Sequence, residues 1–312
     1  MKYFFYIPLD MTEGYKVCHH FMPATVFYKA RERRALNIGV SPLSDKGALL
    51  WTAETEDGIN QFSVTEIQHA DEISANMLNI LEEAKKQEVD ILCLPEMLGG
   101  RELNDSVKEK LSEFPDEGEA YPAITILPSI WSNHHNVSEM VDSYGDAIAE
   151  QEKQHSFPFR DAETEEIYRE NIKPERVIHL IHCPGIGRMA VAICKDALIM
   201  NYLHFILDIL KVTLLFVPSY STGSYDFKEI LQTCRSADCC VTWINTCSAE
   251  TLPNTKSDNF SEIGFVVKTG KNSDSIKNGT FICNRGMRHC GAKGSLNCRK
   301  CLFIHKLQFE WG

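Results

Sequence analysis

Short apolar stretches alternate along the chain with stretches whose apolar residues recur at helical spacing. The strand-like stretches are residues 36–41, 89–94, 123–127, 177–182, 188–193, 211–217 and 239–245. Apolar residues recur at helical spacing in residues 64–87, 197–210 and 227–238. Residues 137–141 and 147–152 predict the two strands of a β-hairpin. Because strands and helices alternate, the pattern predicts an α/β protein with buried sheet.

Regions outside this alternating pattern define the expected organisation of the chain. Residues 1–33 are rich in aromatic side chains and end in a basic cluster, and we treat them as an N-terminal extension of unknown role. Residues 34–275 form the main domain. Residues 276–312 are basic and rich in Cys and His, and they either complete that domain or stand apart from it. Residues 161–175 are acidic, and we expect an exposed loop or helix there.

Composition and charge narrow the class of protein. Hydrophobic residues make up 44% of the chain and charged residues 24%, which is ordinary for a globular enzyme. The formal net charge of −11 argues against nucleic-acid binding by the whole surface. The apolar residues 3–9 end at Asp10, too early for a signal peptide, and no stretch is long enough to span a membrane. We therefore expect a cytoplasmic protein without a membrane segment.

Two of the apolar strands end at reactive side chains. One ends at Glu96, directly after Pro95, and the other ends at Cys194. A thiol between a strand and a helix feels the helix N-terminus, which favours the thiolate. A carboxylate at the end of a buried strand is partly desolvated, which suits it to act as a base. On position alone, a buried core cysteine is an equally good interpretation of Cys194, and an exposed loop glutamate is the favoured interpretation of Glu96.

Two further side chains lie in the segment after the predicted hairpin. Lys153, taken alone, is an ordinary lysine of the kind found on most protein surfaces. His155 is a competing candidate base for Cys194, because cysteine–histidine pairs form another class of thiol enzyme.

Several segments, taken in order, resemble the nitrilase/amidase superfamily of carbon–nitrogen hydrolases. Residues 90–96 resemble the family's apolar strand ending in Pro-Glu. Asn136, the turn at residues 142–145 and residues 152–157 resemble its hairpin leading to a lysine. Residues 185–196 resemble its glycine turn, strand and Cys-x-Asp elbow, and residues 214–218 and 235–245 are similar to the elements that follow. The resemblance covers roughly residues 35–270, within the region 34–275 that it assigns to the hydrolase domain.

The resemblance implies a four-layer α-β-β-α sandwich with Cys194 as nucleophile, Glu96 as base and Lys153 as stabiliser of the developing anion. The backbone N–H of Lys195 would complete the oxyanion hole. Family members often use a second glutamate after the lysine, and the sequence does not choose among Glu163, Glu165, Glu166 and Glu170. The implied substrate is a small amide, carbamoyl compound or nitrile. Catalysis would need no cofactor, and we expect a homodimer or larger homo-oligomer.

This sequence departs from the family pattern at the residue after the cysteine. That position is usually aromatic in the family, and here it is Lys195. Its side chain either enters the pocket, where it would favour an anionic substrate, or points to solvent. Asp196 is read as a structural partner near the elbow.

The C-terminal segment carries two further candidate functions. Cys298 and Cys301 have the spacing of one half of a zinc knuckle, and Cys290 and His305 lie close enough in sequence to complete a structural zinc site. The alternative is a set of reduced thiols. Residues 275–309 contain no acidic residue but seven basic ones, Lys277, Arg285, Arg288, Lys293, Arg299, Lys300 and Lys306. They form either a solvated face or a docking patch for nucleic acid or a partner protein.

The leading interpretation is a thiol-dependent hydrolase of non-peptide C–N bonds. Its main alternative is a catalytically atypical nitrilase-like module that serves as a binding or signalling subunit, in a nucleic-acid-linked assembly through the basic segment. A Cys194–His155 enzyme of another class is the third hypothesis.

Overall fold

A computed structural model of the chain describes residues 12, 14–44, 49–113, 120–161, 164–221, 224–247, 249, 262–268, 279–282 and 301–308. The helices are α1 (Tyr28–Arg33), α2 (Ala70–Lys86), α3 (Arg101–Ser112), α4 (Met200–His204) and α5 (Tyr225–Ser236). Two short helical segments are the 3-10 turn η2 (Cys194–Leu198) and the π-helical η3 (Phe205–Ile209). None of the helices in these ranges is both long and apolar enough to cross a membrane.

Three sheets hold the strands. The first sheet has the order β1 (Lys16–Phe21), β12 (Val177–Cys183), β13 (Gly187–Val191), β14 (Leu214–Ser219), β15 (Cys240–Asn245), β16 (Glu262–Val267) and β17 (Thr280–Ile282). The second sheet has the order β18 (Phe303–Gln308), β2 (Ala35–Val40), β5 (Ile91–Cys93), β6 (Ile124–Ile126), β8 (His135–Asp142) and β7 (Ile130–Ser132), with β9 (Ala147–Glu152) also paired to β8. The small sheet has the order β10 (Pro158–Arg160), β11 (Ile167–Glu170), β4 (Ile59–Ile67) and β3 (Leu49–Glu56).

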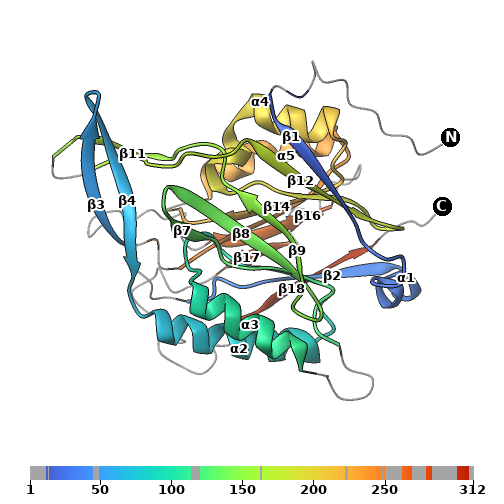
Figure 1. The fold of residues 1–312 in the computed structure, drawn as a ribbon. Coiled ribbons are helices and arrows are strands. Elements are labelled where there is room, and N and C mark those ends of the chain that lie inside the picture. The colour runs from blue at the N-terminus through green and yellow to red at the C-terminus, as the bar shows by residue number, and fades with distance from the viewer. Residues whose placement is uncertain are drawn as a thin grey trace.

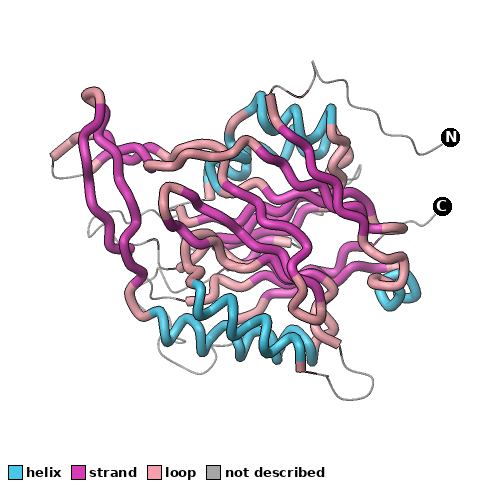
Figure 2. The backbone as a smooth tube through the Cα atoms, viewed as in Figure 1, coloured by secondary structure: helices cyan, strands magenta, loops and turns pink. Residues whose placement is uncertain are grey.

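The two large sheets pack face to face with helices on their outer sides. Ile38 and Ile91 of the second sheet share one apolar cluster with Leu180 and Met189 of the first sheet. A separate cluster packs Leu92 of the second sheet against helices α2 and α3. Figure 1 shows α2 and α3 on one outer side and α4 and α5 on the other, and Figure 2 shows the strands between these two groups of helices. The predicted mixed α/β fold is confirmed.

The helix predicted at residues 64–87 begins later than expected. Helix α2 starts at Ala70, and Ile73, Met77, Ile80, Leu81 and Ala84 form its buried face. Residues 64–67 belong instead to β4, which pairs with β3 in an antiparallel hairpin. The two strands meet at Asp57 and Gly58, both with positive φ, and an Asp-Gly turn of this kind is a strong hairpin signal. The prediction missed this turn and was wrong for the first residues of the segment.

The expectation of an exposed loop or helix at residues 161–175 is also wrong in part. Residues Ile167–Glu170 form β11, which pairs in parallel with β4. Glu170 and Asn171 are buried. The acidic composition concealed a strand because one of its carboxylates is turned inward, where it has a cationic partner.

Both terminal regions contribute strands to the large sheets. Strand β1 pairs in parallel with β12, and β18 pairs antiparallel with β2 across the full length of both strands. Leu307 of β18 is buried in the cluster between the two sheets, whereas its neighbour Lys306 is exposed.

The packing of β18 predicts a stability effect that is confined to one face of the strand. Leu307→Ala removes buried apolar atoms from the core and should lower the free energy of unfolding by about 2–5 kcal/mol. Lys306→Ala on the solvent side should change it by less than about 0.5 kcal/mol. Urea unfolding followed by circular dichroism measures both variants. Equal effects at the two positions would contradict the described register of β18.

Candidate active site

Two carboxylates, one ammonium and one thiol lie together at the ends of strands from all three sheets. Glu96 follows β5, Lys153 follows β9, Cys194 follows β13 and Glu170 ends β11. None of the four is more than 3% exposed. The sequence analysis placed Glu96 and Cys194 at strand ends and Lys153 directly after a hairpin, and their positions agree with this. The structure also brings Glu170, one of the four candidate second glutamates, to the group.

Lys153 is the charged centre of this group. Its Nζ lies 2.7 Å from Glu96 Oε1 and 2.6 Å from Glu170 Oε2. The Asn136 side-chain amide donates to both carboxylates, at 2.8 Å to Glu96 and 3.1 Å to Glu170. Two buried carboxylates are thus compensated by one ammonium and one amide, as burial of charge requires.

The charge state of the group follows from its contacts. Burial by itself lowers the pKa of Lys153, but the carboxylates of Glu170 and Glu96 outweigh burial and raise this pKa well above its usual value. Burial raises the pKa of Glu170, although the ammonium of Lys153 opposes that change. Lys153 therefore stays protonated and offers a fixed positive charge beside Cys194.

Cys194 lies at a sharp change of backbone direction. Ile193 is extended, whereas Cys194 has a φ of 48°, in the left-handed region that costs a non-glycine residue about 1–3 kcal/mol. This conformation turns the chain from β13 into η2. The Glu96 carboxylate and the backbone N–H of Tyr220 lie beside the Cys194 thiol and shift its pKa in opposite directions.

Cys194 needs a base, because its surroundings disfavour the thiolate. Burial raises the pKa of the thiol and the Glu96 charge adds to that effect, while Lys153 opposes it. Glu96 is held in place by the Tyr220 N–H, which donates to its Oε2 at 3.0 Å, and its own N–H donates to Ser219 O at 3.3 Å. The carboxylate beside the thiol is thus fixed by the end of β14.

His155 does not pair with Cys194. Its Nδ1 lies 2.9 Å from Oδ1 of Asp196, which is fully buried. Asp196 also accepts from the backbone N–H groups of Gln154 at 3.0 Å and His155 at 2.8 Å. Asp196 therefore ties the segment after Lys153 to the elbow after Cys194, which is the structural role expected for it. The Cys194–His155 hypothesis has no support from this geometry.

A cavity of about 390 Å³ opens onto the reactive side chains. It is lined by Leu49, Trp51, Phe62, Val64, Glu96, Met97, Lys153, Phe157, Phe159, Arg160, Cys194, Tyr220, Ser221 and Ala249. Lys195 is absent from the described lining, and its side chain is half-buried elsewhere. The described lining therefore gives no support to the interpretation in which the Lys195 side chain enters the pocket and favours an anionic substrate.

The remaining predicted residues fall in three groups. Of the four candidate second glutamates, Glu170 reaches the site, Glu165 and Glu166 are exposed in or beside the loop before β11, and Glu163 lies outside the described residues. Of the candidate zinc ligands, Cys290 and Cys298 lie outside the described residues, Cys301 precedes β18 and His305 belongs to it. Within the described ranges, no cluster of three or more Cys, His, Asp or Glu is arranged to hold a metal. Six of the seven basic residues of the C-terminal segment also lie outside these ranges.

Sequence reasoning missed the residues that support the reactive group. Asn136 appeared only as part of a resemblance, and its bridge between Glu96 and Glu170 depends on β8 and β11 lying side by side at the site. The aromatic lining from β3 and β4 was missed because the Asp57-Gly58 turn was not read as a hairpin.

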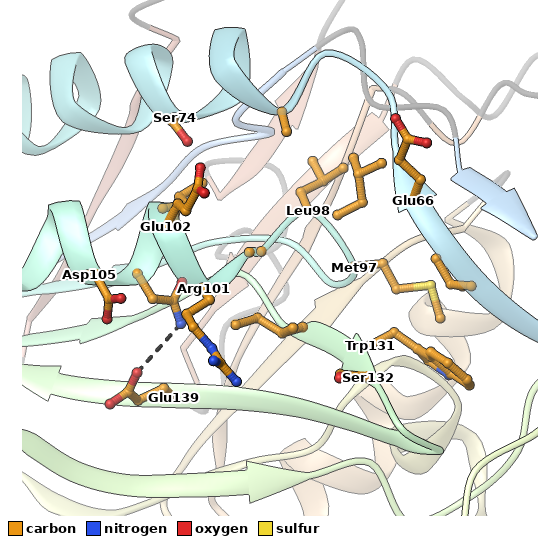
Figure 3. A pocket seen from close by; sticks show the side chains of 18 of the residues that line it. Glu66, Ser74, Met97, Leu98, Arg101, Glu102, Asp105, Trp131, Ser132 and Glu139 are labelled. Atoms are coloured by element: carbon orange, nitrogen blue, oxygen red, sulfur yellow. Dashed lines mark hydrogen bonds between the residues drawn. The ribbon is translucent and has the colours of Figure 1, made fainter.

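A second hollow adjoins the cavity. This groove has a volume of about 670 Å³ and shares Val64 and Met97 with the cavity. Figure 3 shows Met97 and Trp131 toward one end and Asp105 and Glu139 toward the other. No cysteine belongs to its described lining, so the nucleophile candidate belongs to the smaller cavity alone.

Comparison with known proteins supports the fold. No known protein-family model and no curated protein sequence matches this chain. Among solved structures, Nit3 of Saccharomyces cerevisiae, a member of branch 10 of the nitrilase superfamily, is 15% identical with a TM-score of 0.52, and the match covers 89% of this chain and 91% of that one. An amidase from Nesterenkonia sp. is also 15% identical with a TM-score of 0.52, covering 88% and 91%. The NitFhit protein of C. elegans is 17% identical with a TM-score of 0.51, and the match covers 88% of this chain but 61% of that longer one.

At these identities the likeness establishes architecture. The chain has the fold of the nitrilase superfamily, in agreement with the resemblance read from its sequence motifs.

The buried ion network predicts a pH-dependent loss of stability. Lys153→Met leaves the carboxylates of Glu96 and Glu170 buried without their cation, so the free energy of unfolding at pH 8 should fall by about 3–5 kcal/mol. Lowering the pH to 5 should recover part of this loss, because the folded variant then takes up a proton that the unfolded chain, with its glutamate pKa near 4.5, binds less tightly. Urea unfolding at both pH values measures the effect.

The matched control is Lys173→Met, which removes an exposed lysine. It should leave stability within about 0.5 kcal/mol of the parent at both pH values. A Lys153→Met protein as stable as this control at pH 8 would contradict the proposed compensation of the buried carboxylates.

Proposed function

We propose that this protein is a thiol-dependent hydrolase of non-peptide C–N bonds, acting on a linear amide, a carbamoyl compound or a nitrile. One observation carries the proposal. A buried thiol, the carboxylate beside it and a charged ammonium line the same cavity. The nitrilase-superfamily fold supports the assignment, since the superfamily members it resembles include amidases.

In the first half-reaction, Glu96 takes the thiol proton of Cys194 as the sulfur attacks the carbonyl carbon of an amide. The C–S bond forms while the carbonyl π electrons move to oxygen. The Lys153 ammonium stabilises this oxyanion, together with the backbone N–H of Lys195. The second position of a short helical turn suits that N–H for the role, because it has no acceptor within the turn.

The tetrahedral intermediate collapses when the C–N bond breaks. The proton held by Glu96 passes to the leaving amine, and a thioester to Cys194 remains. Glu96, again a carboxylate, then takes a proton from water as the water oxygen attacks the thioester. Release of the carboxylic acid returns the proton to the sulfur and restores the resting thiol.

Glu170 is a positioning residue in this scheme. It contacts Lys153 and Asn136 but does not line the cavity. Its carboxylate and that of Glu96 accept from two of the three N–H groups of the Lys153 ammonium, which fixes the ammonium and leaves the third N–H for the oxyanion.

The proposal predicts selective alkylation of one thiol. Iodoacetamide should modify Cys194 at least about 10-fold faster than Cys18, a half-buried thiol outside the cavity, because Glu96 removes the Cys194 proton during attack. Glu96→Gln should slow labelling of Cys194 by about 10²-fold or more and leave labelling of Cys18 unchanged. Peptide mapping by mass spectrometry over a range of pH measures both rates.

Loss of activity provides the second readout. A panel of linear amides, carbamoyl compounds and nitriles should yield ammonia with the parent protein, and Cys194→Ala should abolish that release. Labelling of Cys194 no faster than that of Cys18, with no hydrolysis across the panel, would overturn the proposal in favour of a binding module.

A further inference from the structure

The small sheet brings four aromatic rings into mutual contact. The Trp51 ring lies 6.3 Å from Phe62, 5.4 Å from Phe159 and 5.4 Å from Tyr168, all edge to face. Phe62 and Phe159 are 5.1 Å apart, and Phe159 stacks on Tyr168 at 5.5 Å. These separations fall in the favourable range for aromatic pairs. We call these four side chains, one from each strand of the small sheet, the aromatic wall.

The aromatic wall forms one side of the Cys194 cavity. Trp51, Phe62 and Phe159 line the cavity directly, and Tyr168 packs behind them. Phe62 is almost fully buried, whereas Trp51 remains 39% exposed. A large apolar ring that is left partly uncovered at a cavity wall gains free energy when a ligand covers it.

The charges around the cavity are confined to the reactive end. Apart from Glu96 and Lys153, the only charged side chain in the described lining is Arg160. Arg160 is already engaged by Glu165, through an ion pair of 3.3 Å and a hydrogen bond of 3.2 Å to its backbone oxygen. The part of the substrate that lies away from Cys194 therefore meets rings and aliphatic side chains.

We infer that the aromatic wall binds a flat apolar group of the substrate, so that the C–N bond cleaved at Cys194 belongs to an aryl or arylalkyl amide or nitrile. The inference rests on the proposed function and names its substrate class. A cavity of about 390 Å³ is at the small end of the usual range for small-molecule sites, which suits one ring and a short linker.

The position of Trp51 allows this one ring of the aromatic wall to be altered without disturbing the core. Strands β3 and β4 lie between β2 and α2 in sequence and pair only within the small sheet. In Figure 1 this hairpin stands at the edge of the molecule, to one side of the two large sheets. Trp51 is absent from the core clusters, so its replacement should leave the fold intact.

The test compares two electrophiles that differ by one ring. Iodoacetamide and N-benzyliodoacetamide carry the same reactive carbon, and the rate of labelling at Cys194 is measured for each by peptide mapping. Rates at Cys18 correct for intrinsic reactivity. The benzyl reagent should label Cys194 about 10-fold faster than iodoacetamide, as expected when one aromatic contact is gained.

Variants of one strand separate recognition from stability. Trp51→Ala should abolish the benzyl preference, and Trp51→Phe, which keeps a ring, should retain most of it. Leu50→Ala is the matched control, because Leu50 is 42% exposed beside Trp51 and is not part of the described cavity lining. It should keep the full preference. Circular dichroism checks that each variant is folded.

The outcomes distinguish the two proposals. Two results would overturn the substrate class but not the proposed hydrolase function. One is fast labelling of Cys194 by both reagents without a preference for the benzyl reagent, and the other is a benzyl preference that survives Trp51→Ala. Slow labelling of Cys194 by both reagents would overturn the proposed function, and with it the inference that depends on it.

Discussion

The position of every reactive group in this molecule depends on one buried ammonium. Lys153 draws Glu96 and Glu170 to within hydrogen-bond distance, and these three residues come from different strands of the second and small sheets. Replacing a buried ion network with apolar side chains of similar volume is often neutral or stabilising, so stability alone does not explain such a network. Its value here lies in geometry, because the network holds a carboxylate and a positive charge beside the thiol.

The sequence predicted the reactive centre better than its surroundings. Glu96 and Cys194 follow apolar strands, and a polar residue directly after an apolar run can be recognised from the sequence alone. Glu170 could not be chosen from its acidic neighbours, because only the parallel pairing of β11 with β4 turns it inward. The central strands of the large sheets were predicted from apolar runs, but β1, β7, β16, β17 and β18 were not. The hairpin β3–β4 was missed because its strand pattern continues directly into the helical pattern of α2.

The candidate reactive side chains and the aromatic wall come from different parts of the fold. The ends of the large-sheet strands fix Glu96, Lys153 and Cys194 through contacts buried in the body of the protein. The rings that line the cavity come mainly from the small sheet, which has its own pairing and its own apolar cluster. The shape of the cavity can therefore change through substitutions on one hairpin, while the reacting atoms keep their arrangement.

The backbone at Cys194 has a consequence for how such a chain changes over time. A non-glycine residue with a positive φ carries backbone strain, and glycine at the same position would remove that strain. A thiol at position 194 and an unstrained backbone at that position therefore exclude each other. A lineage that did not need the thiol could replace it with glycine, which would remove the backbone strain but leave a small cavity where the buried sulfur packs.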